Sequence, residues 1–333
     1  MKIRVGTFNL FQFVEPPFSW YTKKEKFNIE QWNQKTTWIK NQISEMNCDI
    51  IGFQEVFSKK ALKTLLDELG FKYFKTIDTP RIDKKNELVY TSTIVALASK
   101  YPIKNLKKVE IDFSALKKHH LNGFFKFARE PIKATITLAN QKELDIYVCH
   151  LKSNRDNEFE YVFTKNSTLD EKKEKVKKAL EENYSISLKQ RLCEASSIFS
   201  DISRTKNPAI LMTDLNDKEF SITIEALSNK KYHNENLIKD DYLMLDAYYH
   251  FDKKIYNPHP EQKEIKRTPT SYFAGKGNVL DYIFVSSLFD KNKKNNIGKI
   301  TSYEVFDKHL QKNQNGSLLN SDHSQVVCEL EFN

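Results

Sequence analysis

The most restrictive feature of this sequence is a set of short apolar segments that each end in a carboxylate or an amide. In the clearest, residues 209–217, Ile, Leu and Met follow Pro208 and lead to Asp214 and Asn216. A short apolar run with polar flanks predicts a buried strand. Alternation along a strand places Asp214 and Asn216 on the same side, where they can face a phosphate or a cation. Taken alone, this ending is more typical of a turn or a helix cap, so its meaning depends on the other strands.

Several other strands end in, or begin with, polar residues of the same kind. Residues 3–9 and 49–55 alternate or are apolar throughout, and they end at Asn9 and Glu55. Residues 132–138 and 143–149 predict a hairpin that leads to His150. Residues 278–286 predict a strand that carries Asp281, and Asp322 and His323 precede a last strand at 325–332.

Helices are predicted between these strands. Trp32, Ile39, Ile43 and Met46 have helical spacing, as do the leucines of residues 62–69 and the apolar residues of 188–199. Thr168 and Glu171 form the pattern of a capping box, and residues 220–227 predict a short helix. Strands interleaved with covering helices predict an α/β sandwich with its functional side chains at the strand ends.

Length and composition favour one large domain over residues 1–333, because no repeat, low-complexity tract or Gly/Ser-rich linker divides the chain. Residues 104–123 predict irregular structure. Within them we expect His119 and His120 to be an exposed pair rather than a metal site, because adjacent residues of a regular element point to different sides. An aromatic segment around Pro16 and Pro17 is expected to pack over a strand end, with stacking on a base as the alternative.

The net charge of +9 favours a polyanionic partner such as nucleic acid, although a solvated basic surface explains it equally well. The four cysteines are scattered, without the spacing of a zinc site or a disulfide framework. The first residues enter a strand pattern at once, and no apolar run approaches the length of a membrane span. We expect a cytoplasmic monomer, with signal-independent export left open.

In their order along the chain, these segments resemble the endonuclease/exonuclease/phosphatase family, which includes DNase I-like nucleases and Mg²⁺-dependent phosphatases. The resemblance spans residues 3–332. Any one segment is common by chance, whereas six in family order are specific. They are Thr7-Phe-Asn9, Phe53-Gln-Glu55, His150-Leu-Lys-Ser153, Thr213-Asp-Leu-Asn-Asp217, Leu280-Asp-Tyr-Ile283 and Ser321-Asp-His323.

The resemblance implies a four-layer α/β/β/α sandwich, with two mostly antiparallel sheets face to face and helices outside. It also implies phosphoester hydrolysis with Mg²⁺ or Mn²⁺. Mg²⁺ takes oxygen ligands and is usually held by one or two protein carboxylates and the substrate phosphate. The ligands implied are Glu55, as the principal one, with Asn9 and Asp322 nearby; Asp214 and Asn216 are alternatives for a second ion.

The family pattern also implies roles for the other site residues. Asp214 would orient or deprotonate the attacking water, and Asn216 would touch the phosphate. Asp281 would fix the tautomer of His323 and favour its charged form, beside the charge that develops on phosphorus. His150 would contact another phosphate oxygen or assist the leaving group, and Glu87 is a possible carboxylate partner for it.

Three basic residues are candidates for substrate binding. Arg129 resembles an arginine of bacterial members that can make a bidentate phosphate contact, with a surface salt bridge as the alternative. Lys152 and Arg155 would extend a basic rim. The sequence departs from the family pattern at Thr213, where Gly is common, and at Cys149, where Asn is common. Both departures are expected to alter packing more than chemistry.

The motifs and the positive charge favour a metal-dependent nuclease that acts on DNA or RNA, because basic and aromatic side chains neutralise phosphates and stack on bases. The signature of inositol polyphosphate 5-phosphatases is absent, which weakens a lipid-phosphatase function. A phosphatase or phosphodiesterase acting on a phosphoinositide, a nucleotide or another small phosphoester is the alternative with the same site. A non-catalytic nucleic-acid-binding relative is the third hypothesis.

Overall fold

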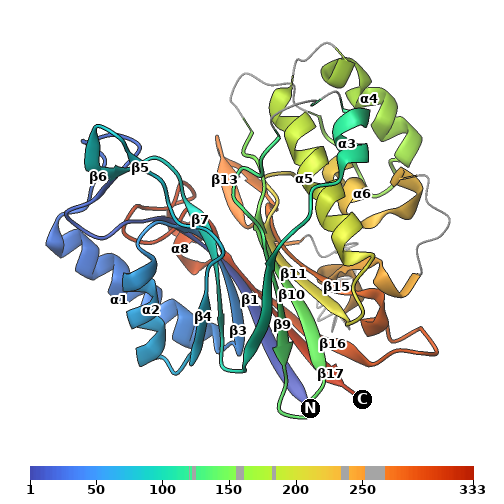
Figure 1. The fold of residues 1–333 in the computed structure, drawn as a ribbon, viewed down its shortest axis with the longest axis horizontal. Coiled ribbons are helices and arrows are strands. Elements are labelled where there is room, and N and C mark those ends of the chain that lie inside the picture. The colour runs from blue at the N-terminus through green and yellow to red at the C-terminus, as the bar shows by residue number, and fades with distance from the viewer. Residues whose placement is uncertain (120, 122–124, 155–160, 182–184, 234–239, 252–266) are drawn as a thin grey trace.

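Two six-stranded sheets pack face to face at the centre of the computed structural model (Figure 1). The structure describes residues 1–119, 121, 125–154, 161–181, 185–233, 240–251 and 267–333. The first sheet has the strand order β16-β17-β1-β3-β7-β4, and the second has the order β12-β15-β11-β10-β9-β8.

The strands of the first sheet are β1 (Lys2–Phe13), β3 (Ile50–Val56), β4 (Tyr73–Lys75), β7 (Ile94–Ser99), β16 (Gly298–Phe306) and β17 (Gln325–Phe332). Those of the second are β8 (Ile103–Lys108), β9 (Ile132–Thr137), β10 (Glu143–His150), β11 (Ala209–Asp214), β12 (Met244–Asp246) and β15 (Asp281–Ser286). Two small sheets contain β2 (Ser19–Trp20), β5 (Ile82–Asp83) and β6 (Asn86–Tyr90), and β13 (Ser271–Phe273) and β14 (Lys276–Asn278).

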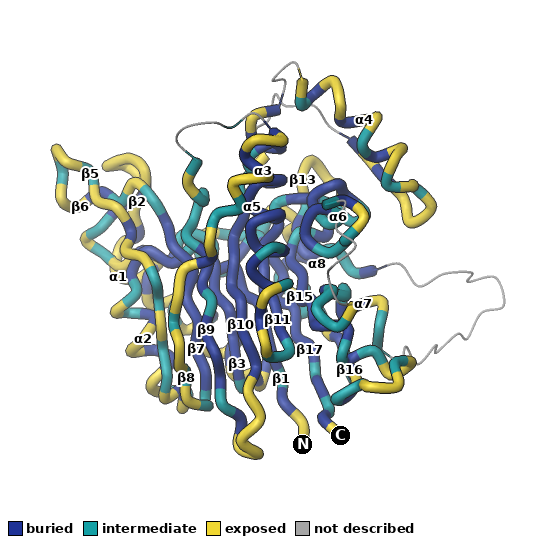
Figure 2. The backbone as a smooth tube through the Cα atoms, turned by 45° about the vertical axis from the view of Figure 1, so that its right-hand side comes forward, coloured by how far each residue is buried: buried dark blue, intermediate teal, exposed yellow. Residues whose placement is uncertain are grey.

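Helices cover the outer faces of both sheets. They are α1 (Ile29–Met46), α2 (Lys59–Glu68), α3 (Phe113–Lys118), α4 (Leu169–Glu181), α5 (Ile186–Ile202), α6 (Ile222–Ser228), α7 (Ala247–His250) and α8 (Lys308–Lys312), with 3₁₀ turns η1 (Lys230–His233), η2 (Asp240–Tyr242) and η3 (Ser287–Phe289). As Figure 2 shows, the central strands of both sheets are buried along most of their length, whereas α1, α2 and α4 expose one side.

Three apolar clusters separate these layers, and the alternation along β11 shows how one strand serves two of them. Ile210 and Met212 lie in the cluster between the sheets, while Leu211 lies in the cluster beneath α4, α5 and α6. A third cluster joins the first sheet to α1 and α2. The expected four-layer α/β/β/α sandwich is therefore confirmed, and its sheets are mixed and open.

The two sheets approach each other closely at Gly52 on β3. A Cβ atom at that position would lie 3.0 Å from Met212 Cβ and 3.0 Å from a methyl group of Val148, both on the opposite sheet. Such a contact is closer than packed carbon atoms accept without movement. The absence of a side chain at Gly52 therefore sets the local distance between the sheets.

The structure corrects two expectations about residues 104–123. Residues 103–108 form the edge strand β8, and residues 113–118 form α3. Their pattern is hard to recognise, since β8 leaves its lysines exposed and Leu106 only partly buried. His119 is buried and its Nε2 lies 3.1 Å from the Tyr232 hydroxyl, so the expectation of an exposed pair is wrong for this residue; His120 lies outside the described residues. Within the described chain, no helix has both the length and the apolar character needed to cross a membrane.

Candidate active site

Strand pairing brings the polar strand ends of both sheets to one edge of the sandwich. In the second sheet, His150 on β10 pairs with Asp214 on β11, and Asp214 pairs with Asp281 on β15. Because β15 runs antiparallel to β11, the first residue of β15 meets the last residue of β11. In the first sheet, β17 is antiparallel to β1, so the residues before Gln325 lie beyond the strand pairs that end at Thr7. This edge faces away from both chain termini (Figure 1).

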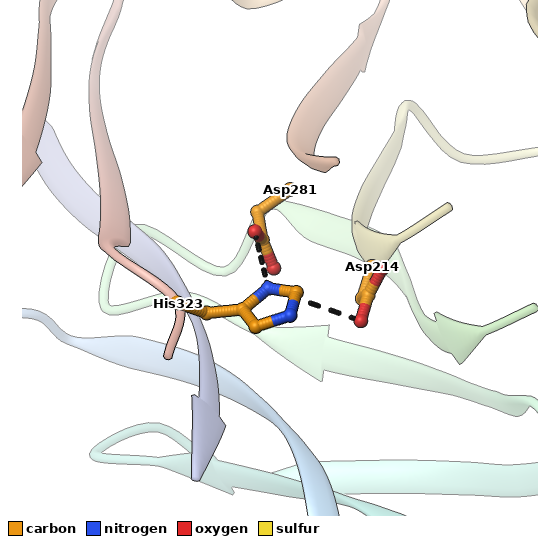
Figure 3. Close-up of side chains that lie close together, drawn as sticks. All are labelled: Asp214, Asp281 and His323. Atoms are coloured by element: carbon orange, nitrogen blue, oxygen red, sulfur yellow. Dashed lines mark hydrogen bonds and ion pairs between the residues drawn. The ribbon is translucent and has the colours of Figure 1, made fainter. Parts of the chain in front are cut away.

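The imidazole of His323 lies between two aspartates (Figure 3). Its Nδ1 is 2.8 Å from Asp281 Oδ2 and 4.0 Å from Asp214 Oδ2. Burial by itself lowers the pKa of an imidazole, but here the negative charges of Asp281, Asp214 and Asp322 outweigh it, and the pKa of His323 is raised well above 6.5. These charges therefore favour the imidazolium form of His323.

Asp214 is the point at which the two sheets meet. Asn9 Nδ2, on β1 of the first sheet, donates to Asp214 Oδ2 at 3.0 Å, and the backbone N–H of Asn216 donates to Asp214 Oδ1 at 2.9 Å. Burial raises the pKa of Asp214 to about 7, opposed by the charge of His323 and aided by that of Asp281. A carboxyl group with this pKa exchanges a proton readily near neutral pH.

His150 has the opposite electrostatic environment from His323. Burial, followed by the positive charges of Arg129 and His323, lowers the pKa of His150 well below 6.5 and so favours the neutral ring. Its Nε2 lies 3.3 Å from Asp214 Oδ2, while its buried Nδ1 has no hydrogen-bond partner in the described part of the chain. The carboxylate beside His150 is thus Asp214, whereas Glu87, the partner considered from the sequence, is exposed on β6.

Two of the predicted site residues have left-handed backbone conformations. Glu55 has φ 59° and Asn216 has φ 51°. Residues with a Cβ atom adopt this region at a cost, and functional sites are where such strain is concentrated. Asn216 Nδ2 donates to Leu151 O at 3.1 Å, so its side chain holds the segment that follows His150.

Asn9, Glu55 and Asp322 offer oxygen atoms suited to a divalent cation. Asp322 Oδ1 is buried and has no hydrogen-bond partner among the described residues. Burial, with a further contribution from the negative charge of Glu55, raises the pKa of Asp322 to about 6. Glu55 Oε2 accepts from the N–H of Gln12 at 3.0 Å, which leaves its other oxygen for a ligand. An unpaired buried carboxylate oxygen near a second carboxylate fits a hard cation.

A second group that can hold a metal consists of Asp214, Asp281 and His323, whose ligand atoms lie within 4.8 Å of one another. The raised pKa of His323 argues against its use as a ligand, because an imidazolium has no free lone pair. The residues around Glu55 and Asp322 therefore fit a cation better.

Lys35 is a functional candidate that the sequence analysis did not identify. Its buried ammonium group donates to the carbonyls of Phe11, Leu318 and Asn320 at 2.8, 2.8 and 2.9 Å. Burial lowers the pKa of Lys35 to about 7, while the charges of Glu55 and Asp322 raise it. Lys35 thus joins α1 to the segments beside Asn9 and Asp322. Lys35 lies on the buried stripe of α1, between Trp32 and Ile39, and a lysine at such a position is the sequence feature that could have identified it.

Two charged residues of α5 were missed in the same way. Glu194 is 1% exposed, and its carboxylate accepts from the N–H groups of Ala128 at 2.7 Å and Lys152 at 2.8 Å. Arg191 is also 1% exposed, and its Nη1 donates to Lys152 O at 3.0 Å. Both residues lie on the buried face of α5 and fix the backbone next to Arg129 and just after His150.

Of the three basic residues predicted to bind substrate, Arg129 and Lys152 line a groove of about 1250 Å³ that borders the site. We call it the large groove; Tyr21, Arg81, Thr93 and Phe113 also line it. Arg129 Nη1 donates to Leu151 O at 3.1 Å, the same carbonyl that Asn216 contacts. Six Lys or Arg side chains and four Asp or Glu side chains line this groove, so its charge is positive. Arg155 lies outside the described residues.

The two departures from the family pattern contact each other. Cys149 and Thr213 are paired across β10 and β11, and Cys149 Sγ donates to Thr213 Oγ1 at 2.9 Å. Both are buried directly behind His150 and Asp214. Their contact is consistent with a role in packing beneath the site.

A profile of the Endonuclease/Exonuclease/phosphatase family matches residues 6–292. The solved catalytic domain of human Nocturnin with bound sulfate has a TM-score of 0.59 at 15% identity, over 100% of this chain and 94% of that one. An endonuclease/exonuclease/phosphatase from Bacteroides vulgatus gives 0.55 at 16%, over 100% of both chains. TDP2 of D. rerio complexed with single strand DNA product gives 0.53 at 11%, over 99% of both.

Comparison with curated protein sequences gave no match. At these identities, the solved structures show that the fold is shared. The family profile, which covers most of the chain, shows more: the chain belongs to the Endonuclease/Exonuclease/phosphatase family, whose members are metal-dependent nucleases or phosphatases.

Proposed function

We propose that the protein is a nuclease that hydrolyses phosphodiester bonds of DNA or RNA with Mg²⁺ or Mn²⁺. The observation that carries the proposal is the buried His323–Asp281 pair, which lies beside Asp214 at the edge of a positively charged groove. A fixed imidazolium favours the negative charge that develops on a phosphoryl group during attack. An open groove lined by several cations suits a polymer better than a small phosphoester.

The proposed chemistry divides the work among four residues. Asp214, whose pKa of about 7 suits a base, takes the proton of the attacking water as the oxygen bonds to phosphorus. The P–O bond to the leaving sugar oxygen breaks, and that oxygen keeps the electron pair and takes a proton from solvent water. Asp281 holds His323 in its charged form beside the phosphate. Neutral His150 orients Asp214 through its Nε2, a role favoured over proton donation by its lowered pKa.

The remaining residues would hold the cation and the substrate. Glu55 and Asp322, with Asn9, are the proposed ligands of the metal. When bound there, a divalent cation would offset charge on the substrate phosphate. Arg129 and Lys152 would contact phosphates of the chain on the side of the large groove. Single strand DNA product in a TDP2 of the same fold supports this choice of substrate.

The proposal is tested by incubating the protein with plasmid, single-stranded DNA and RNA in the presence of Mg²⁺ or Mn²⁺. Glu55→Ala and His323→Ala should each lower the cleavage rate by about 100-fold or more, the effect of losing one catalytic group. Asp145→Asn is a matched control, since Asp145 is a buried carboxylate at the other end of β10. Turnover of small phosphoesters without cleavage of any polymer would instead favour the phosphatase.

A further inference from the structure

A second groove, of about 440 Å³, is lined by the β13–β14 hairpin and by the residues that precede α6. We call it the hairpin groove; it is lined by Phe163, Lys218, Phe220, Phe273, Lys276 and Asn278, among others. The hairpin is anchored on the candidate active site. Ser271 forms a β-bridge with His323, and the Thr270 hydroxyl accepts from the N–H groups of Leu280 and Asp281.

Strand order places the two grooves on opposite sides of the site. In the second sheet, Asp281, Asp214 and His150 lie at the ends of the successive strands β15, β11 and β10. Beyond β10 come β9 and β8, and the large groove is lined there by Lys108 of β8 and by Arg129, which precedes β9. The hairpin groove lies on the other side, because most of its residues either follow β11 directly or lead into β15; residues 161–163, which follow β10, complete its wall.

The first sheet gives the same arrangement. Its strand order β17-β1-β3-β7 places Asn9 and Glu55 in the middle. Thr93, which precedes β7, lines the large groove, whereas His323, which precedes β17, is bridged to the hairpin. The two sheets therefore agree that the site lies between the grooves. In Figure 1, β13 stands at the end of the sheets opposite the termini.

Both grooves carry aromatic side chains that face solvent. Phe113, in the large groove, is 76% exposed; Tyr21, which also lines that groove, is 49% exposed; and Phe273, at the end of β13, is 65% exposed. Exposed aromatics next to cations are the means by which proteins hold single strands, since bases stack on the rings while cations meet the phosphates. Bases paired in a duplex are already stacked and offer no such face.

We infer that the substrate is an unpaired nucleic acid strand that continues through both grooves, and that the scissile bond is internal. The inference rests on the proposed function and deepens it from a nuclease to an endonuclease for single strands. The large groove holds nucleotides on one side of the bond, and the hairpin groove holds them on the other. An active site with an open groove on each side requires no strand end.

Circular single-stranded DNA tests this directly, because a circle has no end. The circle, its linear form and the same sequence as a duplex are incubated with the protein and Mg²⁺ or Mn²⁺. The expected result is conversion of the circle to a full-length linear strand before shorter products, at a rate close to that of the linear form, with slower cleavage of the duplex. Cleavage of the linear strand with a resistant circle would overturn the inference and leave the proposed function intact. Failure to cleave any of them, or RNA, would overturn both.

Variants of the exposed rings test the grooves separately. Phe273→Ala and Phe113→Ala should each lower kcat/KM for a single-stranded oligonucleotide by about 10-fold, the typical effect of losing one stacking platform. The loss should be smaller for bis(p-nitrophenyl) phosphate, which is too small to fill the grooves. Ile29→Ala is the matched control, since Ile29 is 64% exposed on α1. Equal kcat/KM values for wild type and both aromatic variants would refute binding through the grooves.

Discussion

Substitution of Glu194 should separate stability from substrate binding in a measurable way. Its carboxylate accepts two backbone N–H groups, from Ala128 at 2.7 Å and from Lys152 at 2.8 Å, and the side-chain amide of Gln190 at 3.1 Å. Glu194→Ala leaves both backbone donors without a partner. At about 1–2 kcal/mol for each partly buried donor, the free energy of unfolding should fall by about 2–4 kcal/mol. Glu194→Gln keeps one acceptor oxygen, and should lose about half as much.

The functional effect follows from what the two donors support. Ala128 precedes Arg129, and Lys152 lies two residues after His150. Release of this backbone should raise KM for an oligonucleotide more than it lowers kcat, because Arg129 and Lys152 are proposed to contact phosphates. Stability is measured by urea unfolding followed by tryptophan fluorescence, and KM and kcat under conditions where each variant is folded.

Asp145→Asn separates this effect from a general loss of stability. Asp145 is a buried carboxylate that accepts from the Thr135 hydroxyl at 2.8 Å and the Asn207 amide at 3.2 Å, far along β10 from His150. It should lower stability without changing KM. If the free energy of unfolding of Glu194→Ala lies within about 0.5 kcal/mol of the wild-type value, these hydrogen bonds do not contribute the stability assigned to them. If Glu194→Gln is as damaging as Glu194→Ala, the remaining oxygen is not used.

Three further outcomes are expected. Asp281→Asn removes a charge that raises the pKa of His323, so the imidazolium should be lost at lower pH. The alkaline limb of the pH profile of kcat/KM should therefore move to lower pH. An unchanged limb would argue against a charged His323. Mn²⁺ or Mg²⁺ at 100 times its Kd should stabilise the wild type by about 2.7 kcal/mol, seen as a raised Tm, and the shift should disappear in Asp322→Asn if Asp322 is a ligand. Lys35→Met leaves three carbonyls without their shared donor and should destabilise the fold by about 1–3 kcal/mol in urea unfolding, whereas equal stability would show that removing a buried charge offsets the loss.

The sequence predicts those parts of the fold in which local pattern and burial agree. The stripe of Trp32, Ile39, Ile43 and Met46 on α1 is buried as expected. The capping box at Thr168 and Glu171 is formed, with N–H groups donating to both side chains at 3.2 and 2.7 Å. Strand β8 and helix α3 were not predicted. An exposed, lysine-rich edge strand such as β8 has little apolar alternation to detect.

The sequence predicts which residues form the site better than it predicts which of them are in contact. Polar residues at the ends of apolar strands stand out, because the residues beside them in the strand are mostly apolar. Which of them meet depends on strand order. Asp214 contacts His150 because β10 and β11 are parallel neighbours, although 58 residues of chain separate the strands. The side chains of Glu194 and Arg191 form hydrogen bonds with backbone groups of distant segments, and no sequence motif predicts such partners.

The close approach of the sheets at Gly52 has a consequence for how this protein tolerates change. Asn9 belongs to one sheet and Asp214 to the other; likewise His323 lies just before β17 of the first sheet, whereas Asp281 begins β15 of the second. Each of these hydrogen bonds links the two sheets, so its length depends on the distance between them. A methyl group added at Gly52 would push the sheets apart locally by a few tenths of an ångström, so turnover should fall together with stability. Substitutions deep in the apolar interior, between the sheets, are thus expected to change activity although they lie outside the active site.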